Sequence, residues 1–265
     1  MRTSDLPSDP SPLSPFLEAA GTADGVREWR LEYTSRGDRV PARLLLPEAP
    51  GGDRPVVVVA HGARGDKGAA YIDAACLPWA RGGAAVVAID LPLHGERRSP
   101  KLSERVLGSV LADHEASELE ASLWSDLVVQ AVGDLRRAID AAGSHAEVDA
   151  TRAGFVGFSL GAMIGTLCCA AEPRLGAAAL ALAGAGLGPA ATDPGAFVGE
   201  IAPRPLLLVN AERDSVIPRT AAERLHAAAG EGSRVEWYDA PHDALPGVAL
   251  KSIWGFLRAS LPVPG

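Results

Sequence analysis

Cysteine is scarce in this chain of 265 residues, which contains three. Three thiols cannot form a framework of disulfides, and the adjacent Cys168 and Cys169 lie in an Ala-rich apolar stretch typical of small core residues. The sequence has neither a C-x-x-C pair nor the His and Cys spacing of a metal site. We therefore expect free thiols, a cytoplasmic location, and no metal or other cofactor.

Long hydrophobic runs are missing too. Residues 1–20 carry Pro7, Pro10, Pro12 and Pro15 among serines and acidic residues, without the apolar stretch behind a basic start that a signal peptide needs. No later segment approaches an uninterrupted apolar run of bilayer length. The sequence thus predicts no leader and no membrane span, and residues 1–20 are expected to form a flexible arm.

Positive charge is in deficit, because 25 Lys and Arg face 33 Asp and Glu and give a net charge of −8. Nucleic acids and anionic membranes are bound through clustered cations. The one dense basic spot, around Arg97–Arg98, is typical of a solvated face. We therefore expect neither of these partners, and a small molecule in their place.

Short apolar runs alternate with helical patterns along the rest of the chain. Val26–Tyr33 and Arg39–Leu46 flank a turn signal and predict a hairpin, and the β-branched run Val56–Ala60 predicts a strand buried on both faces. Further strands are expected over Ala84–Ile89, Ala153–Phe158, Gly176–Ala183, Pro205–Val209 and Arg234–Tyr238. Helices are expected over 68–81, 116–142, 160–171, 219–229 and 246–260.

This alternation predicts a single α/β domain over residues 21–265, with a mainly parallel sheet and helices on both faces. Sites in such sheets are built at the carboxyl ends of the strands. The longest irregular stretches after strand ends, 91–118 and 184–200, are expected to cover a site there.

The strongest motif is Gly157-Phe158-Ser159-Leu160-Gly161, where a predicted strand passes into a helix. A serine in so sharp a turn needs almost no side chain two residues before and after it. The turn raises the hydroxyl above the sheet edge, near a helix N-terminus whose partial positive charge favours a developing anion. We interpret Ser159 as a nucleophile.

A serine nucleophile needs a base, and the base needs an acid that orients it. His242 follows the last predicted strand and Asp214 follows the strand before it, so the order Ser159, Asp214, His242 is the one expected for this elbow. Asp239 and Asp243 also lie in late loops, but they are too near His242 in sequence for the usual arrangement. We predict a triad with Asp214 as its acid.

The anion formed in acyl transfer needs two hydrogen-bond donors. We expect the Leu160 N–H after the nucleophile, and the Ala63 N–H from the loop His61-Gly62-Ala63-Arg64-Gly65. Arg64, or Arg97–Arg98, is a candidate for binding a substrate carboxylate. His94, which precedes a glycine, is expected either to line the pocket or to fix a turn.

A zinc site of Asp90, His94 and His114 lacks the spacing that such sites show, so no metal is predicted.

Taken together, His61-Gly62, the elbow, the Asp214 loop and His242 resemble the α/β-hydrolase superfamily. The segment Asp90-Leu91-Pro92-Leu93-His94-Gly95-Glu96-Arg97 is similar to its dienelactone-hydrolase-like esterases. The resemblance covers about residues 25–260 and implies an α/β-hydrolase fold with an eight-stranded, mostly parallel sheet, and hydrolysis through an acyl-enzyme. Dienelactone hydrolases proper use a cysteine nucleophile where Ser159 stands here, which puts dienelactone in doubt as the substrate.

The leading interpretation is a serine hydrolase of small to medium soluble carboxylic esters, because neither covering segment carries a long apolar lid. A peptidase or amidase of the prolyl-oligopeptidase type shares the layout, but no propeller that selects peptides accompanies it. A non-catalytic binding protein on the same fold is the third alternative, and it has no reason to retain all three triad residues.

Overall fold

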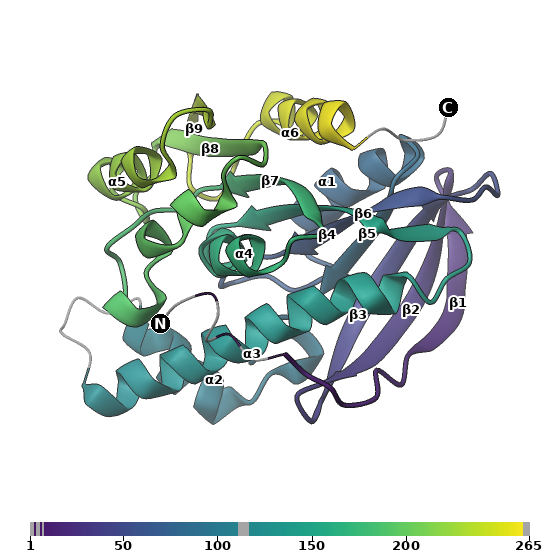
Figure 1. Cartoon of the computed structure of the whole chain (residues 1–265), viewed down its shortest axis with the longest axis horizontal. Coiled ribbons are helices and arrows are strands. Elements are labelled where there is room, and N and C mark those ends of the chain that lie inside the picture. Colours follow the sequence, from purple (N-terminus) through teal and green to yellow (C-terminus); the bar gives the residue numbers. More distant parts are fainter. Residues whose placement is uncertain (1–2, 4–5, 7, 111–116, 262–265) are drawn as a thin grey trace.

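The computed structural model describes residues 3, 6, 8–110 and 117–261. Nine strands form one sheet in the order β1-β2-β3-β5-β4-β6-β7-β8-β9 (Figure 1). The strands are β1 Phe16–Ala23, β2 Val26–Ser35, β3 Asp38–Pro47, β4 Arg54–Ala60, β5 Ala85–Ile89, β6 Val148–Phe158, β7 Leu175–Ala181, β8 Leu206–Arg213 and β9 Arg234–Pro241. From β5 to β9 along this order every neighbouring pair is parallel, whereas β1, β2 and β3 are antiparallel to their neighbours. The predicted α/β architecture with a mostly parallel sheet is confirmed.

The expected count of eight strands is wrong, because β1 adds a ninth at the edge of the sheet. Asp24 and Gly25 join β1 to β2 with φ values of 52° and 77°. Positive φ at both central residues is what a two-residue hairpin turn demands, and Asp-Gly supplies it. Most β1 side chains are exposed, so the strand lacks the apolar alternation by which the others are recognised.

The expected flexible arm over residues 1–20 is therefore corrected for the part that enters β1. Described residues before β1 are also held, since Asp9 pairs with Arg137 at 2.5 Å and accepts a hydrogen bond from the Arg36 N–H at 2.6 Å. Leu6 is buried in the core. The described residues around Asp9 and Ser11 form no helix or strand but pack along α3, where Arg137 donates to their two carbonyl oxygens.

The helices are α1 Ala70–Arg81, α2 Pro100–Val110, α3 Glu118–Ala142, α4 Leu160–Ala171, α5 Arg219–Ala229 and α6 Gly247–Ser260. Helix α2 falls inside the stretch 91–118 that the sequence left irregular. Val106 and Ser103 are buried, and the apolar residues Leu102, Val106 and Leu107 recur at helical spacing, so the pattern of a helix is present there and was missed. Residues 111–116 lie outside the described part of the chain. None of the helices in the described ranges is both long and apolar enough to cross a membrane.

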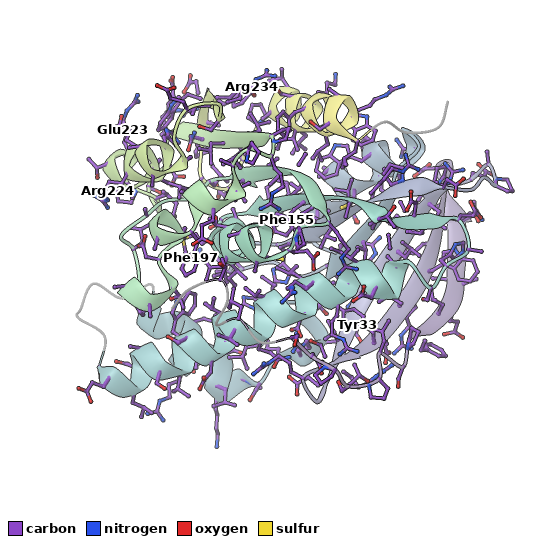
Figure 2. All side chains as sticks on the ribbon, viewed as in Figure 1. Tyr33, Phe155, Phe197, Glu223, Arg224 and Arg234 are labelled. Atoms are coloured by element: carbon purple, nitrogen blue, oxygen red, sulfur yellow. The ribbon has the colours of Figure 1, made fainter. Side chains whose placement is uncertain are left out.

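Two apolar clusters cover the two faces of the sheet. In β4, Val56, Val58 and Ala60 belong to the cluster that includes α3 and α4, whereas Val57 and Val59 belong to the one with α1 and α6. This alternation is the two-residue period of a strand buried on both sides. Figure 2 labels Tyr33, whose hydroxyl donates to the Asp134 carbonyl of α3 at 2.7 Å.

The parallel pairing places the carboxyl ends of β4, β6, β8 and β9 at one edge of the sheet. The next residues along the chain are His61, Ser159, Asp214 and His242. The fold thus places at one edge of the sheet the residues that separate sequence motifs had indicated.

Candidate active site

Ser159 is the turn between β6 and α4, and its backbone adopts φ 52° and ψ −116°. A side chain with a Cβ rarely occupies this region, and holding one there costs on the order of 1–3 kcal/mol. The Ser159 N–H is fixed by the Ala181 carbonyl at 2.8 Å, and the Ser159 carbonyl accepts from the N–H groups of Ala162 and Met163. The strained turn is thus held from both sides.

The flanking glycines are required by contact. A Cβ on Gly157 would lie 2.5 Å from the Gly161 carbonyl oxygen, and a Cβ on Gly161 would overlap the Ala60 and His61 carbonyl oxygens. No real Cβ atom tolerates such distances, so the turn closes only with glycine at both positions. These close contacts are the steric requirement that was inferred for the motif from the sequence.

The structure brings the three predicted triad residues together. His242 Nε2 lies 2.9 Å from Ser159 Oγ, and His242 Nδ1 lies 2.7 Å from Asp214 Oδ2. Both distances are those of hydrogen bonds. The imidazole can therefore take the serine proton on one nitrogen while the carboxylate holds the other N–H.

The carboxylate of Asp214 is itself held in place. Its Oδ1 accepts the N–H groups of Val216 and Ile217, both at 2.8 Å, while the side chain is 7% exposed. Burial raises the pKa of Asp214, but the hydrogen bonds from the imidazole and from the two backbone amides lower it by more, so the pKa lies below its ordinary value. The group stays ionised and oriented beside His242.

The other candidate acids lie elsewhere. Asp239 is exposed and pairs with Arg213 at 2.6 Å, and Asp243 is exposed as well. Among the described residues, the imidazole of His242 has its hydrogen bonds with Asp214 and Ser159 and none with Asp239 or Asp243.

The two expected oxyanion donors lie on the loops that meet at the nucleophile. Leu160 is the first residue of α4, and an N–H at that position has no partner within the helix. Ala63 is half-buried in the loop after β4, and its N–H makes no hydrogen bond to another described residue. The adjacent Gly62 is close to the nucleophile, since a Cβ on it would lie 3.4 Å from Ser159 Cβ.

His61 holds this loop from within. Its Nδ1 lies 2.8 Å from the Gly62 carbonyl oxygen, and its Nε2 accepts the Leu91 N–H at 3.1 Å. Those partners require the neutral form protonated on Nδ1. Burial accordingly lowers the pKa of His61 to about 4.

His94 does not line an open pocket. It is 5% exposed, with Nδ1 2.9 Å from the Pro92 carbonyl oxygen and Nε2 2.9 Å from that of Ala63. His94 was expected either to line the pocket or to fix a turn, and these contacts with two backbone carbonyls agree with the second role.

Asp90 also ties the segment around His94 to the loop after β4, which carries the expected oxyanion donor Ala63 and is called the oxyanion loop below. This fully buried carboxylate accepts the Lys67 N–H at 2.9 Å, the Lys67 Nζ at 2.7 Å and the Glu96 N–H at 2.9 Å. Gly95 follows with φ 51°, and a Cβ there would overlap the carboxylate. The motif read in the sequence from Asp90 to Arg97 therefore holds one loop against the other.

The arginines divide into two cases. Arg64 is exposed, and no ion pair joins it to another described residue. The guanidinium of Arg97 is instead engaged in two ion pairs, with the buried Asp134 at 2.6 Å and with Asp38 at 3.1 Å. We therefore remove Arg97 from the candidates for substrate binding.

His114 lies outside the described residues. Among the described residues no group of three or more His, Cys, Asp or Glu side chains is placed to hold a metal ion.

Tyr71 was missed from the sequence. It lies in the first turn of α1, and its hydroxyl accepts the Gly62 N–H at 2.7 Å. A tyrosine in a helical pattern carries no local signal that it reaches back to a loop nine residues earlier.

Residues 40–243 match the model of the dienelactone hydrolase family. The chain belongs to the dienelactone hydrolase family. The resemblance seen in the sequence is confirmed, and membership places the chain among the carboxylic-ester hydrolases. No curated protein matches the sequence.

Several solved structures resemble the chain along nearly its whole length. An acetyl xylan esterase from Paenibacillus sp. R4 has a TM-score of 0.77 at 19% identity, covering 98% of this chain and 92% of its own. A cold-adapted esterase from an Arctic intertidal metagenomic library has a TM-score of 0.72 at 20% identity, covering 91% and 97%. Acetyl xylan esterase 1 from Thermoanaerobacterium sp. has a TM-score of 0.69 at 16% identity, covering 94% and 88%. At these identities the likeness establishes the α/β-hydrolase fold.

Asp214→Asn should cut kcat for ester hydrolysis by up to about 10⁴-fold, because an amide keeps the shape of the side chain but favours the wrong imidazole tautomer. Asp239→Asn is the matched control and should retain most of the activity, since that carboxylate is exposed and far from Nδ1. Steady-state kinetics on both variants decides the assignment. A near wild-type Asp214→Asn with a collapsed Asp239→Asn would contradict it.

Acid should destabilise the fold through His61. The unfolded chain binds a proton at this residue below about pH 6.5, whereas the folded chain binds it only near pH 4, so acid favours unfolding. The free energy of unfolding should fall by up to about 3 kcal/mol from this group between those pH values. Urea titrations at pH 7, 5.5 and 4.5 on wild type and His61→Gln measure it. The wild type should lose more stability than the variant, and equal losses would refute the prediction.

Proposed function

We propose that this chain hydrolyses carboxylic esters with small to medium acyl or alcohol groups, through an acyl-enzyme on Ser159. The observation that carries the proposal is the continuous hydrogen-bonded series from Asp214 through His242 to Ser159 Oγ, with distances of 2.7 and 2.9 Å. An imidazole between a fixed carboxylate and a hydroxyl is the arrangement that makes a serine nucleophilic.

In the first half of the reaction, His242 Nε2 removes the Ser159 proton while Oγ forms a bond to the ester carbonyl carbon. The carbonyl oxygen becomes an anion, and the N–H groups of Ala63 and Leu160 donate hydrogen bonds to it. When the tetrahedral species collapses, the bond to the alkoxy oxygen breaks. That oxygen takes the proton from His242 and leaves as the alcohol.

In the second half, His242 removes a proton from water, and the resulting hydroxide oxygen bonds to the acyl carbon. Collapse of the second tetrahedral species breaks the bond to Ser159 Oγ, which recovers its proton from His242. The carboxylic acid then leaves. Asp214 stabilises the imidazolium at both stages without itself accepting a proton.

Small to medium acyl or alcohol groups are favoured because the segments expected to cover the site, 91–118 and 184–200, carry no long apolar lid. The names of the acetyl xylan esterases support the same choice.

The cytoplasm remains the location we expect, because all three cysteines are free and buried and a reducing compartment preserves them.

Ser159 should be the residue that becomes acylated. A fluorophosphonate should add one adduct to the wild type, and peptide mapping should place it on Ser159. Ser159→Ala should fold normally, take no label and retain no more than the residual 10³–10⁴-fold acceleration over water that oxyanion binding provides. Labelling at another residue would overturn the mechanism, and an unlabelled, inactive wild type would favour a non-catalytic binding protein.

A panel of p-nitrophenyl esters and matched p-nitroanilides should separate esterase from amidase. We expect acetate and propionate esters to give the highest kcat/KM, with a fall for longer acyl chains and little hydrolysis of the anilides. Anilides cleaved as fast as esters would support the peptidase alternative instead.

A further inference from the structure

Tyr71 connects the oxyanion loop to the nucleophile, although the reaction steps above do not use it. Its Oη accepts the Gly62 N–H at 2.7 Å. A Cβ on Gly62 would lie 3.6 Å from this Oη and 3.4 Å from Ser159 Cβ. The tyrosine ring packs edge-on against Phe158, with centroids 5.6 Å apart. One side chain thus contacts both the residue before the nucleophile and the residue before the expected oxyanion donor.

The loop is shaped around this hydroxyl. A Cβ on Gly65 would lie 2.5 Å from Tyr71 Oη and 3.2 Å from its Cζ. The Gly65 N–H donates to the Gly62 carbonyl at 3.0 Å and closes the turn. Any residue larger than glycine at position 65 would displace the hydroxyl from the Gly62 N–H.

Three consecutive peptide groups of this loop are fixed by side chains. The first, which carries the Gly62 N–H, is held by Tyr71. The second joins Gly62 to Ala63, and its carbonyl oxygen is held by His61 Nδ1. The third carries the Ala63 carbonyl, 2.9 Å from His94 Nε2.

The direction of the Ala63 N–H follows from these contacts. In a planar trans peptide the N–H points opposite to the C=O, so fixing the Gly62 carbonyl fixes the Ala63 N–H. Besides these direct contacts, the peptides on each side limit the rotation of the middle peptide, because each shares a Cα atom with it. Those two are the peptides bound by Tyr71 and His94.

We propose that Tyr71 and His94 are positioning residues, which hold the Ala63 N–H toward the oxygen that becomes negative during ester cleavage. The inference rests on the proposed function, because it assigns that N–H to the oxyanion. An interaction made only in the transition state raises kcat without changing substrate binding. Loosening either contact should therefore lower kcat and leave KM nearly unchanged.

Tyr71→Phe tests the first contact, because it removes the hydroxyl and keeps the ring on Phe158. We expect kcat for p-nitrophenyl acetate to fall about 10- to 100-fold with KM within about twofold, as for a displaced oxyanion donor. The affinity for a trifluoromethyl ketone, which forms a tetrahedral adduct, should fall in parallel. Tyr33→Phe is the matched control, since it removes a hydroxyl bonded to a backbone carbonyl at 2.7 Å in the core. It should lower the melting temperature and leave kcat within about twofold.

Gly65→Ala tests the same contact without touching the tyrosine. In the wild-type background it should lower kcat, because its Cβ displaces Oη. In the Tyr71→Phe background the added loss should be much smaller, because the hydroxyl is already absent. Losses that multiply fully would contradict a shared cause.

His94 is tested by a pair of variants. His94→Phe removes the ring nitrogen that lies 2.9 Å from the Ala63 carbonyl oxygen and should lower kcat, whereas His94→Gln can place an amide N–H there and should lose less. Equal kcat in the two, at equal melting temperature, would remove His94 from the proposal.

The outcomes for function and for positioning are separate. An active wild type labelled on Ser159, with kcat of Tyr71→Phe unchanged or with loss of stability alone, overturns the inference and leaves the proposed function intact. A wild type that neither hydrolyses esters nor takes the label overturns both.

Discussion

The close approach of α4 to the end of β4 is the contact on which the site depends. Gly161 faces the carbonyl oxygens of Ala60 and His61 with no room for a Cβ. The same contact brings the loop after β4 beside Ser159, so the nucleophile and one of the expected oxyanion donors are placed together. A methyl group at Gly161 would separate the helix from the strand and both halves of the site from each other.

The spacing of neighbouring strands sets the distances between the three predicted triad residues. Asp214 and His242 follow β8 and β9, which pair directly, so the acid reaches the base across one strand spacing of about 4.8 Å. Ser159 approaches from β6, with β7 between it and β8. The loops bring the three side chains within hydrogen-bond distance of one another. Backbone hydrogen bonds hold these loops in place. Ser159 has three such bonds, and the Asp214 carboxylate accepts two backbone N–H groups.

The sequence allowed those features to be predicted that depend on local demands. The elbow was found because Gly157 and Gly161 are needed at fixed positions, and the core strands were found from continuous apolar runs. Strand β1 was missed because its exposed residues lack alternation, although the Asp24-Gly25 turn marked the hairpin. Helix α2 was missed although its apolar residues Leu102, Val106 and Leu107 recur at helical spacing.

The parts of the site that escaped prediction depend on contacts between distant segments. Tyr71 fits the pattern of the helix in which it lies, so the sequence does not indicate that its hydroxyl accepts the Gly62 N–H. The motif from Asp90 to Arg97 was recognised as family-like, but its physical role required the structure: one buried carboxylate holds Lys67 and the backbone of Glu96, and Gly95 leaves room for it.

This arrangement explains how a reaction can rely on loops, which are ordinarily the mobile parts of a fold. The loop after β4 exchanges hydrogen bonds with the loop after β5 through His61, His94 and Lys67. Each bond is made to a backbone group or to a buried carboxylate, so breaking one leaves a buried polar group unpaired, at a cost of about 1–3 kcal/mol. These bonds join the two loops, so the Ala63 N–H proposed as an oxyanion donor has a fixed direction without belonging to a helix or strand.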